Sequence, residues 1–530
     1  MKKALRRLLI LVLIALIGFL YYYITIPAVN IHSRGFWMFL IVGIVLLFGI
    51  ITIARTRDVN KIKDSIIAKI GVGITAVAII IFIIGSILSS PIVNAKKYQQ
   101  LLPVQDSDFS TDIKEVSFNQ IPILDKDSAE LLGNRKMGSM VDMVSQFEVS
   151  SLYTQINYQD VPTRVTPLVY ASPIKWLTNQ KDGIPAYIKI NMTDQNVELV
   201  KLAQGMKYTE SDYFNRYIYR HMRFLYPTYI FDSFNFEIDE EGVPYWVCPV
   251  KDYTIGLFGG ETIGRVVLCN AVTGETVDYN IDEVPSWIDR VFSAELLTEQ
   301  YNYHGMLKHG YLNTLLSQKD CLKTTEGYNY LAIDDDVWMY TGVTSVIADE
   351  SNVGFVLINQ RTRETHFYSI EGAEEYSAMS SAQGQVQHLG YKATFPLLLN
   401  IGNEPTYFIA LKDEAGLVKK YALVNIKRYQ IVAIGDSVSE CEKQYISLLS
   451  SNGITSVASQ SMLKITGNIE KIAQAVIEGN THYYIMLEGT GAIFDVPVAD
   501  YINIIKFNEG DSITFEYSEG TDTNTVYSVR

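Results

Sequence analysis

Cysteine is scarce in this chain, with four among 530 residues, at Cys248, Cys269, Cys321 and Cys441. No two of them form a C-x-x-C pair, which argues against a structural zinc site. Cys248 and Cys269 each end an apolar run in what the pattern predicts to be one sheet, so they are disulfide candidates if this part of the chain lies outside the cytosol. The alternative is that both are buried free thiols that pack as small apolar side chains.

The sequence also lacks the motifs of common catalytic and phosphate-binding sites. G-x-S-x-G, H-E-x-x-H and G-x-x-x-x-G-K-[ST] are all absent, and the seven histidines are scattered. The acidic triplet Asp334-Asp335-Asp336 lacks the alternating spacing and the glycine of a calcium loop. We therefore predict no catalytic residue, no metal site and no cofactor.

Acidic residues are almost missing from the first hundred positions. Residues 1–100 hold twelve Lys and Arg against two Asp and Glu, whereas the whole chain holds 44 against 58. This asymmetry suggests a basic end that lies against anionic lipid headgroups and an acidic body that faces water. An acidic body repels phosphates, so we predict no nucleic-acid partner.

Long apolar runs are confined to the same hundred residues. They are Leu8–Ile26, Phe36–Ile53 and Ile70–Leu88, and none carries a charge. Each approaches the roughly 20 residues that cross a bilayer, so we predict an anchor over residues 1–94 with three transmembrane helices, at about 8–28, 35–54 and 69–90. Without an ionisable residue in their middles, the helices are better suited to anchoring than to transport.

Basic residues between these runs predict the orientation. They are Lys2, Lys3, Arg6 and Arg7 before the first run, Arg34 after it, and Arg55, Arg57, Lys61, Lys63 and Lys69 after the second. Because positive charge stays on the cytoplasmic side, we expect a cytoplasmic N-terminus and an extracytoplasmic chain after about residue 95.

The remainder is predicted to be α+β. Residues 95–160 are polar and read as a connector with a short helix near 129–144, whereas short alternating apolar runs broken by Gly, Pro, Asn and Asp follow. Helical stretches at 211–226, 293–316 and 372–389 precede groups of strands. We therefore predict repeats of a helix on an antiparallel sheet, over 161–290, 291–370 and 371–450.

One segment of the sequence occurs twice. Asn270–Ile281 aligns without gaps to Asn359–Ile370, with Asn, Thr, Glu, Thr, Tyr and Ile matching. Each copy follows a strand-like run, so the match predicts a β-hairpin used twice.

The apolar strand that enters a T-G-E-type turn, Val266–Glu275, resembles the PepSY-type domains of bacterial secreted and membrane proteins. The second copy departs from this pattern, because Arg363 stands where the first has Gly274. The resemblance implies a non-enzymatic binding or regulatory module at the cell envelope, sometimes connected with peptidase control.

Residues 455–530 form a separate segment. At least four predicted strands lie here, and their order resembles the OB-fold, a small β-barrel. Oligonucleotide binding would be an analogy only, because the segment is acidic.

Aromatic residues supply the candidate binding surface. Tyr213 and Tyr217 are four apart on a predicted helix, where they suit either a peptide- or sugar-binding face or a core stripe. Trp246, Trp338 and Tyr407, on predicted strands, are the further candidates.

Three functions remain open. The first is a non-catalytic binding or scaffold protein of a bacterial-type cell envelope, with the lipid bilayer and an envelope protein, peptide or glycan as partners. The second is an envelope hydrolase of cell-wall or peptide substrate, or a regulator of one. The third is a spacer that projects the terminal barrel.

Overall fold

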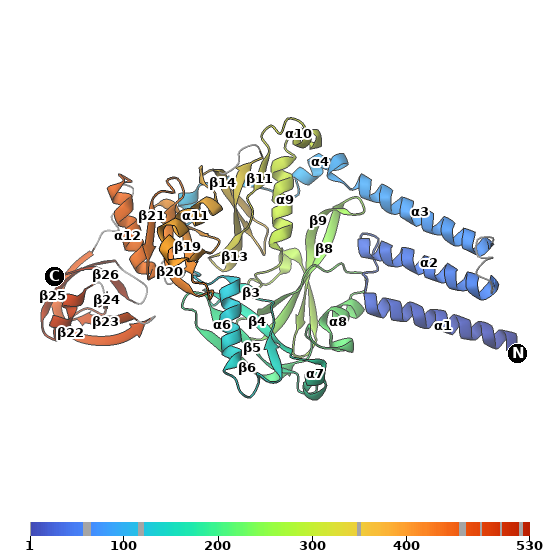
Figure 1. The fold of residues 1–530 in the computed structure, drawn as a ribbon, viewed down its shortest axis with the longest axis horizontal. Coiled ribbons are helices and arrows are strands. Elements are labelled where there is room, and N and C mark those ends of the chain that lie inside the picture. The colour runs from blue at the N-terminus through green and yellow to red at the C-terminus, as the bar shows by residue number, and fades with distance from the viewer. Residues whose placement is uncertain are drawn as a thin grey trace.

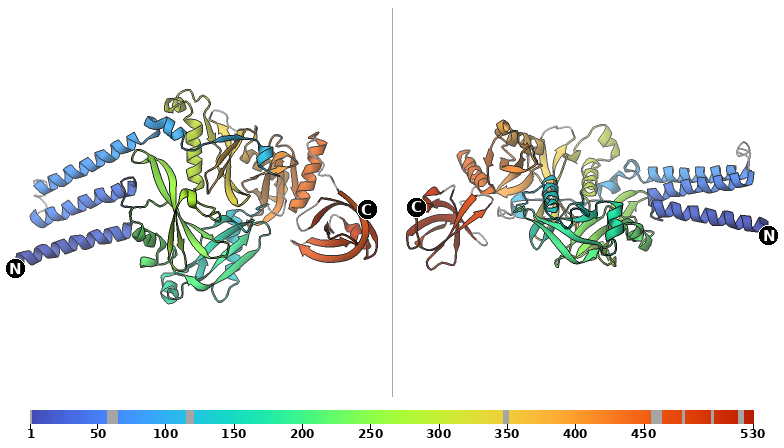
Figure 2. Two further views of the ribbon diagram at one scale, coloured as in Figure 1. Left: turned by 180° about the vertical axis from the view of Figure 1, so that it is seen from behind. Right: turned by 60° about the horizontal axis from the view of Figure 1, so that its bottom comes forward.

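The computed structural model describes residues 2–56, 65–114, 121–346, 351–454, 463–477, 480–498, 501–518 and 523–530. Three long helices project from one end of a β-rich body, and the C-terminal strands lie at the opposite end (Figure 1). Figure 2 shows the same separation from two further directions. Arg57, Lys61 and Lys63, on which the predicted orientation partly depends, lie outside the described residues.

The N-terminal helices occur within a few residues of their predicted positions. They are α1 (Lys2–Thr25), α2 (Arg34–Thr56) and α3 (Ile66–Leu88). Among the described residues, α2 and α3 are long and apolar enough to cross a membrane, and α1 contributes a shorter apolar segment, Ile14–Thr25. Gly71 lets α2 and α3 approach, because a Cβ there would lie 2.6 Å from the Cβ of Phe48.

The same face of the body holds the ends of all three helices. From α8 (Ile218–Leu225), Arg220 donates to the carbonyl of Tyr23 and Arg223 to that of Ile26, at 3.3 and 3.0 Å. The N–H groups of Leu257 and Phe258 donate to Ser89 Oγ, next to the end of α3, at 2.8 and 3.1 Å. The two guanidinium groups satisfy carbonyls at the C-terminus of α1 that the helix leaves open, and the Ser89 hydroxyl joins the end of α3 to the body.

The connector prediction for 95–160 is wrong, because these residues enter the folded body. The segment contains the end of α4 (Pro91–Gln99), then β1 (Gln105–Ser107), α5 (Phe109–Asp112), α6 (Lys126–Gly138), β2 (Phe147–Val149) and β3 (Thr154–Tyr158). β1 pairs in parallel with a strand more than 250 residues away, Gln105 opposite His366. Such long-range pairing leaves no local sequence signal.

Within the described residues, four mostly antiparallel sheets make up the body. The first contains β2, β3, β4 (Val161–Tyr170), β5 (Ile184–Asn191) and β6 (Val197–Met206), with α7 (Pro173–Asn179) between β4 and β5. The second contains β7 (Asn235–Ile238), β8 (Pro244–Ile255), β9 (Gly259–Asn270) and β10 (Thr276–Asn280), and η4 (Ile281–Glu283) follows it. The region 161–290, predicted as the first α+β region, therefore holds three strands of the first sheet and all of the second.

The third sheet follows α9 (Ala294–Met306) and α10 (Tyr311–Leu315). Besides β1, it contains β11 (Leu322–Thr324), β12 (Asn329–Ile333), β13 (Asp336–Ser345), β14 (Ser351–Asn359), β15 (Thr365–Tyr368) and β16 (Gly372–Ala373). The fourth follows α11 (Glu375–Gln385) and η5 (Gln387–Leu389), and α12 (Val438–Ser451) comes after it. It contains β17 (Lys392–Ala393), β18 (Leu397–Ile401), β19 (Glu404–Lys412), β20 (Val418–Asn425) and β21 (Val432–Gly435).

The predicted helices are shorter than expected. The stretch 211–226 contains only η3 (Phe214–Arg216) and α8, and Gly310, with φ +83°, separates α9 from α10 within 293–316. The stretch 372–389 begins as strand β16 before α11 starts.

The four sheets share one strand order. In the first, third and fourth, a short strand and a longer one both pair with the next strand: β2 and β3 with β4, β11 and β12 with β13, β17 and β18 with β19. In the second sheet β7 pairs with β8, and an isolated bridge from Phe231 to Val250 takes the place of the short strand. Two further antiparallel strands complete the first, second and fourth sheets, and the third has β14 and β15 in these places, with β16 beside β14 and β1 added in parallel to β15.

Three of the sheets also use one turn. Asn191, Asn270 and Asn359 end β5, β9 and β14. In each turn the Asn Oδ1 accepts from the backbone N–H groups two and three residues later, and the Asn N–H donates to the carbonyl five residues later. The residue four positions on is left-handed: Gln195 (φ +61°), Gly274 (+77°) and Arg363 (+65°).

The mismatch between Gly274 and Arg363 has a local cause. A Cβ at Gly274 would lie 2.3 Å from the ring of Tyr208, so this turn excludes a side chain. Arg363 has room, and its guanidinium donates to Thr262 Oγ1 at 3.0 Å.

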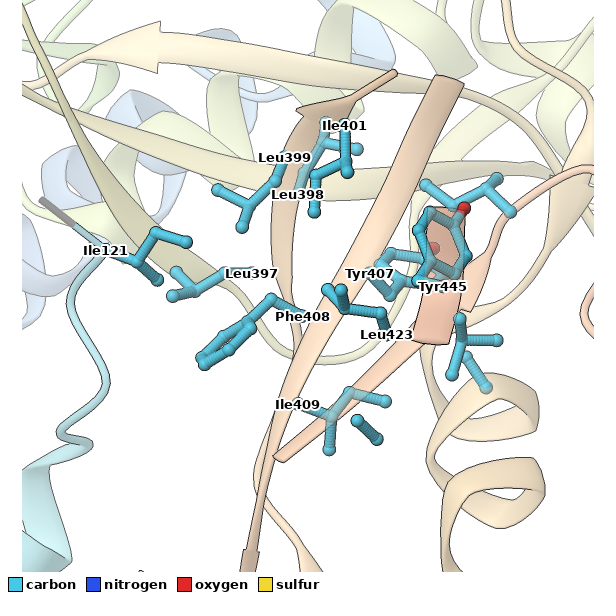
Figure 3. Packing of buried hydrophobic residues seen from close by; sticks show 14 of the residues in the cluster. Ile121, Leu397, Leu398, Leu399, Ile401, Tyr407, Phe408, Ile409, Leu423 and Tyr445 are labelled. Atoms are coloured by element: carbon cyan, nitrogen blue, oxygen red, sulfur yellow. The ribbon is translucent and has the colours of Figure 1, made fainter. Parts of the chain in front are cut away.

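Neighbouring sheets bury shared cores. The first and second sheets enclose one cluster, with Tyr187, Phe236 and Trp246 at its centre. The third and fourth enclose another, in which Leu397, Phe408, Ile409 and Leu423 pack near Tyr407 and Tyr445 (Figure 3). A sheet face that seems open in the sequence is thus covered by the next sheet.

The C-terminal strands pair in a ring. They are β22 (Leu463–Ile477), β23 (Asn480–Leu487), β24 (Ile493–Pro497), β25 (Ser512–Ser518) and β26 (Asn524–Val529), with η6 (Ile502–Lys506) between β24 and β25. The described pairings run β22-β23-β24-β26-β25 and back to β22, and only β24 and β26 are parallel. Ile485, Phe494 and Phe515 are fully buried inside.

Cys248 and Cys269 are free and buried, so the disulfide hypothesis is wrong for this structure. The register opposes Cys248 to Val267 and Cys269 to Trp246, which places the two thiols diagonally across β8 and β9. Diagonal Cα atoms are about 7–8 Å apart, more than a disulfide usually spans. Burial raises the pKa of both thiols, as expected for apolar packing.

Candidate functional site

The five aromatic candidates separate into buried and accessible side chains. Trp246 and Tyr407 are fully buried, so assigning them to a binding surface was wrong. The Trp246 indole N–H donates to the carbonyl of Tyr208 at 2.8 Å, and the Tyr407 hydroxyl donates to that of Ala373 at 3.1 Å. Trp338 is half-buried beside the ring of His366. Only Tyr213 and Tyr217 remain together at an accessible site.

Tyr213 and Tyr217 are not on one helix. Tyr213 lies before η3, and Tyr217 is the residue before α8. Tyr213 is 43% exposed, so the core interpretation fails for it. Both line a pocket of about 500 Å³, which we call the tyrosine pocket. Its lining residues are Tyr170, Ala171, Ser172, Pro173, Glu210, Ser211, Asp212, Tyr213, Tyr217 and Arg220.

Three short elements build the pocket. β4 ends at Tyr170, and Ser172 caps α7 by accepting from the N–H of Lys175 at 3.3 Å. The returning loop is joined to β4 because the N–H of Tyr170 donates to Ser211 Oγ at 3.2 Å. α8 then closes the pocket with Arg220.

Asp212 is the buried acid of the pocket. Its Oδ1 accepts from the Trp176 indole N–H at 3.0 Å, and its Oδ2 accepts from the Thr209 hydroxyl at 2.8 Å. Burial outweighs these bonds and raises the pKa of Asp212 to about 6. The carboxyl therefore titrates close to neutral pH.

Tyr170 brings an unused hydroxyl to the same pocket. The side chain is 7% exposed, and its Oη has no hydrogen-bond partner among the described residues. Buried hydroxyls normally find a partner.

The turn at Phe214 is strained and exposed. Phe214 has φ +52°, a left-handed conformation that a bulky residue adopts at a cost of about 1–2 kcal/mol. Its side chain is 64% exposed, and its ring lies 6.0 Å from that of Trp176. Strain of this kind concentrates at binding sites.

The pocket is lined by two carboxyl groups, of Glu210 and Asp212, and by one guanidinium, of Arg220. Arg220 is committed to two carbonyls, of Tyr23 and Phe214, and its guanidinium lies 4.2 Å from the Tyr23 ring. Glu210 accepts from the Ser150 hydroxyl and keeps its other oxygen. The two carboxyl groups outnumber the guanidinium and lie beside exposed rings, an arrangement that suits a basic or hydroxyl-bearing group.

The sequence pointed to Tyr213 and Tyr217 of this pocket but not to Tyr170, Glu210 or Asp212. The run Tyr208–Phe214, with two acids between aromatic residues directly after a strand, is the signal that could have identified most of them.

No metal centre accompanies the pocket: the described part of the chain contains no group of three or more His, Cys, Asp and Glu side chains placed to hold an ion. Comparison with models of known protein families found no match to the chain, and comparison with curated proteins found no similar sequence.

Proposed function

We propose that this chain is a membrane-anchored, extracytoplasmic binding or scaffold protein of a bacterial-type cell envelope, non-catalytic, and that the tyrosine pocket holds a segment of a partner protein. The strained turn that exposes Tyr213 and Phe214 beside Glu210 and Asp212 is the observation that carries the proposal.

Anchoring is supported by the helices. α2 and α3 expose large apolar side chains along their length, Val72 at 70% and Ile83 at 50% among them, and such surfaces prefer acyl chains to water. The basic residues of the sequence orient the anchor, with the N-terminus inside and the body outside.

The body consists, in this proposal, of tandem PepSY-like modules. Support comes from the strand order that the four sheets share and from the identical Asn turns at Asn191, Asn270 and Asn359. Each module is a mostly antiparallel sheet with one or two helices, and neighbouring modules bury a common core. Rigid tandem modules of this kind suit presentation of a binding site at a fixed distance from the membrane.

The terminal barrel is, in the same proposal, OB-like. Its support is the order of the ring and the long first strand β22, which pairs with both β23 and β25. A second binding surface would then lie at the opposite end of the body from α1, α2 and α3 (Figure 1).

A polypeptide with a basic side chain is the partner that fits best. Tyr and Trp dominate protein-binding hot spots because their rings are amphipathic and rigid. A Lys or Arg inserted between Tyr213 and Tyr217 would meet Glu210 and Asp212, and the Tyr170 hydroxyl would gain a partner.

Site-specific photo-crosslinking in intact cells tests this function. A photoreactive phenylalanine at Phe214 should form a crosslink to one protein, whereas the same group at Tyr376, 45% exposed on α11, should not. Tyr213→Ala should weaken the crosslink several-fold. Equal products from both positions, a crosslink to glycan only, or release of a cleaved product would overturn the proposal.

A further inference from the structure

A second pocket, of about 520 Å³, lies where the body meets α2 and α3. We call it the junction pocket. Its lining residues are Ser33, Arg34, Gly35, Ser86, Ser89, Ser90, Pro91, Tyr98, Ile230, Phe231, Lys251, Tyr253, Phe258, Gly259, Gly260, Glu261, Leu296, Glu299, Gln300 and Tyr303.

Contacts of the β8–β9 tip set the level of this pocket relative to a bilayer. Phe258 packs between the two spanning helices, with its ring 6.4 Å from that of Trp37 and 5.2 Å from that of Phe82. Trp37 is in the first turn of α2, and tryptophans near helix ends mark the headgroup region. The junction pocket is therefore at headgroup depth.

Arg34 is the free cation of the junction pocket. Its guanidinium lies 5.9 Å from the Phe258 ring, and no carboxylate among the described residues pairs with it. Lys251, in contrast, is held between Asp232 and Glu261, at 3.0 and 2.7 Å. Arginine binds phosphate through two parallel N–H bonds, so Arg34 suits a phosphate group.

Gln300, on α9, supplies a hydrogen-bond acceptor, whereas Arg34 supplies a cation. Its side chain is 1% exposed, its amide N–H donates to the carbonyl of Glu261 at 2.7 Å, and its Oε1 has no donor among the described residues. Glu299 is next to it, with one oxygen accepting from the Tyr303 hydroxyl. A buried acceptor without a donor is destabilising, and a ligand N–H would supply the missing hydrogen bond.

We propose that the junction pocket binds the headgroup of an aminophospholipid, with its phosphate on Arg34 and its primary ammonium on Gln300 Oε1 and Glu299. The inference rests on the membrane placement of α2 and α3 proposed above. A zwitterionic headgroup matches both free groups, and its acyl chains would extend along the apolar helices. A quaternary ammonium has no N–H and cannot serve Gln300.

Native mass spectrometry of the full-length chain in detergent tests the proposal without any substitution. The protein is offered equal amounts of phosphatidylethanolamine, phosphatidylcholine and phosphatidylglycerol with the same acyl chains. We expect phosphatidylethanolamine to be retained about tenfold better than the other two, the factor that one hydrogen bond to a charged group represents. Equal retention of ethanolamine and choline lipids, or preference for phosphatidylglycerol, would overturn it.

Three variants assign the contacts. Gln300→Leu should lose the preference for ethanolamine over choline, and Arg34→Gln should lose retention of both lipids. Arg55→Gln, which removes the same charge at the far end of α2, should change neither. Glycerophosphoethanolamine has the same headgroup without acyl chains. If it displaces phosphatidylethanolamine at an equal concentration, the ligand is a free solute and the proposal of a lipid is overturned.

The two proposals can fail separately. If the full-length chain stays dispersed without detergent, both the proposed membrane anchor and this inference are wrong. A chain that needs detergent but shows no headgroup preference removes this inference alone.

Discussion

Glu237 and Asp289 are two buried acids joined by a hydrogen bond of 3.0 Å, from the backbone N–H of Asp289 to Glu237 Oε2. Asp289 Oδ2 in turn accepts from the N–H of Asn157 at 2.6 Å, so the pair connects the first two sheets. Burial, and then the proximity of Glu237, raise the pKa of Asp289 well above its ordinary value. Burial likewise raises the pKa of Glu237.

The first prediction concerns the pH dependence of stability. A carboxyl whose folded pKa is raised stabilises the fold fully below its unfolded pKa of about 4 and loses that contribution as pH rises towards the folded pKa. Asp289→Asn removes the titration and keeps an acceptor for Asn157. Its melting temperature should therefore exceed that of the wild type at pH 8, with the difference shrinking towards pH 4. Asp182→Asn, at an exposed position, is the control. If the melting temperatures of Asp289→Asn and the wild type change with pH in parallel, Asp289 does not have a raised pKa.

The second prediction concerns the tyrosine pocket. Since the pKa of Asp212 is raised to about 6, the stability that its neutral form contributes is present below pH 4 and is lost as pH rises through 6. The loss amounts to about 3 kcal/mol, at 1.36 kcal/mol for each pH unit between the folded and unfolded pKa. The Trp176 indole donates to this carboxyl. The fluorescence of Trp176 should therefore change with a midpoint near pH 6 in the wild type, and this change should be absent in Asp212→Asn. A titration that persists in the variant would assign it to another group.

The third prediction concerns the shared turn. Gly274→Ala places a Cβ against the Tyr208 ring at a positive φ and should destabilise the protein by about 2 kcal/mol or more. Arg363 is at the equivalent position, which already holds a side chain. Arg363→Ala should therefore lower the free energy of unfolding by only about 1 kcal/mol, for its lost hydrogen bond. Urea unfolding followed by fluorescence compares them. Equal costs would show that the two turns do not differ as described.

The fourth prediction concerns the contact between α2 and α3. Gly71→Ile inserts a side chain where Phe48 lies within 2.6 Å of the Cβ position, whereas Gly73→Ile meets nothing within 4 Å. Gly71→Ile should lower the melting temperature in detergent by several degrees, and Gly73→Ile should leave it nearly unchanged. Similar behaviour of the two variants would mean that the helices do not pack through Gly71.

Features set by neighbouring residues were predictable from the sequence. Apolar runs of about 20 residues predict helices without any knowledge of the fold. The Asn270 and Asn359 turns depend on side-chain bonds within three residues, so their likeness is visible in the letters. The turn at Asn191 has the same bonds, but fewer of the residues around it match, so the sequence alone does not indicate it.

Features set by distant residues were not predictable. Trp246 and Tyr407 look like surface aromatics on alternating strands, and only the adjoining sheets bury them. β1 belongs to the third sheet because it pairs with β15, and no local sequence pattern predicts this pairing. The tyrosine pocket joins β4, α7 and α8, and no single segment of the sequence contains both its buried acid, Asp212, and Tyr170.

Thiol labelling in intact cells tests the proposed membrane orientation most directly, because all four native cysteines are buried. A membrane-impermeant maleimide should label Val141→Cys, 86% exposed on the body, in intact cells, and Arg55→Cys only after the membrane is opened. Labelling of Arg55→Cys but not Val141→Cys in intact cells would contradict the account.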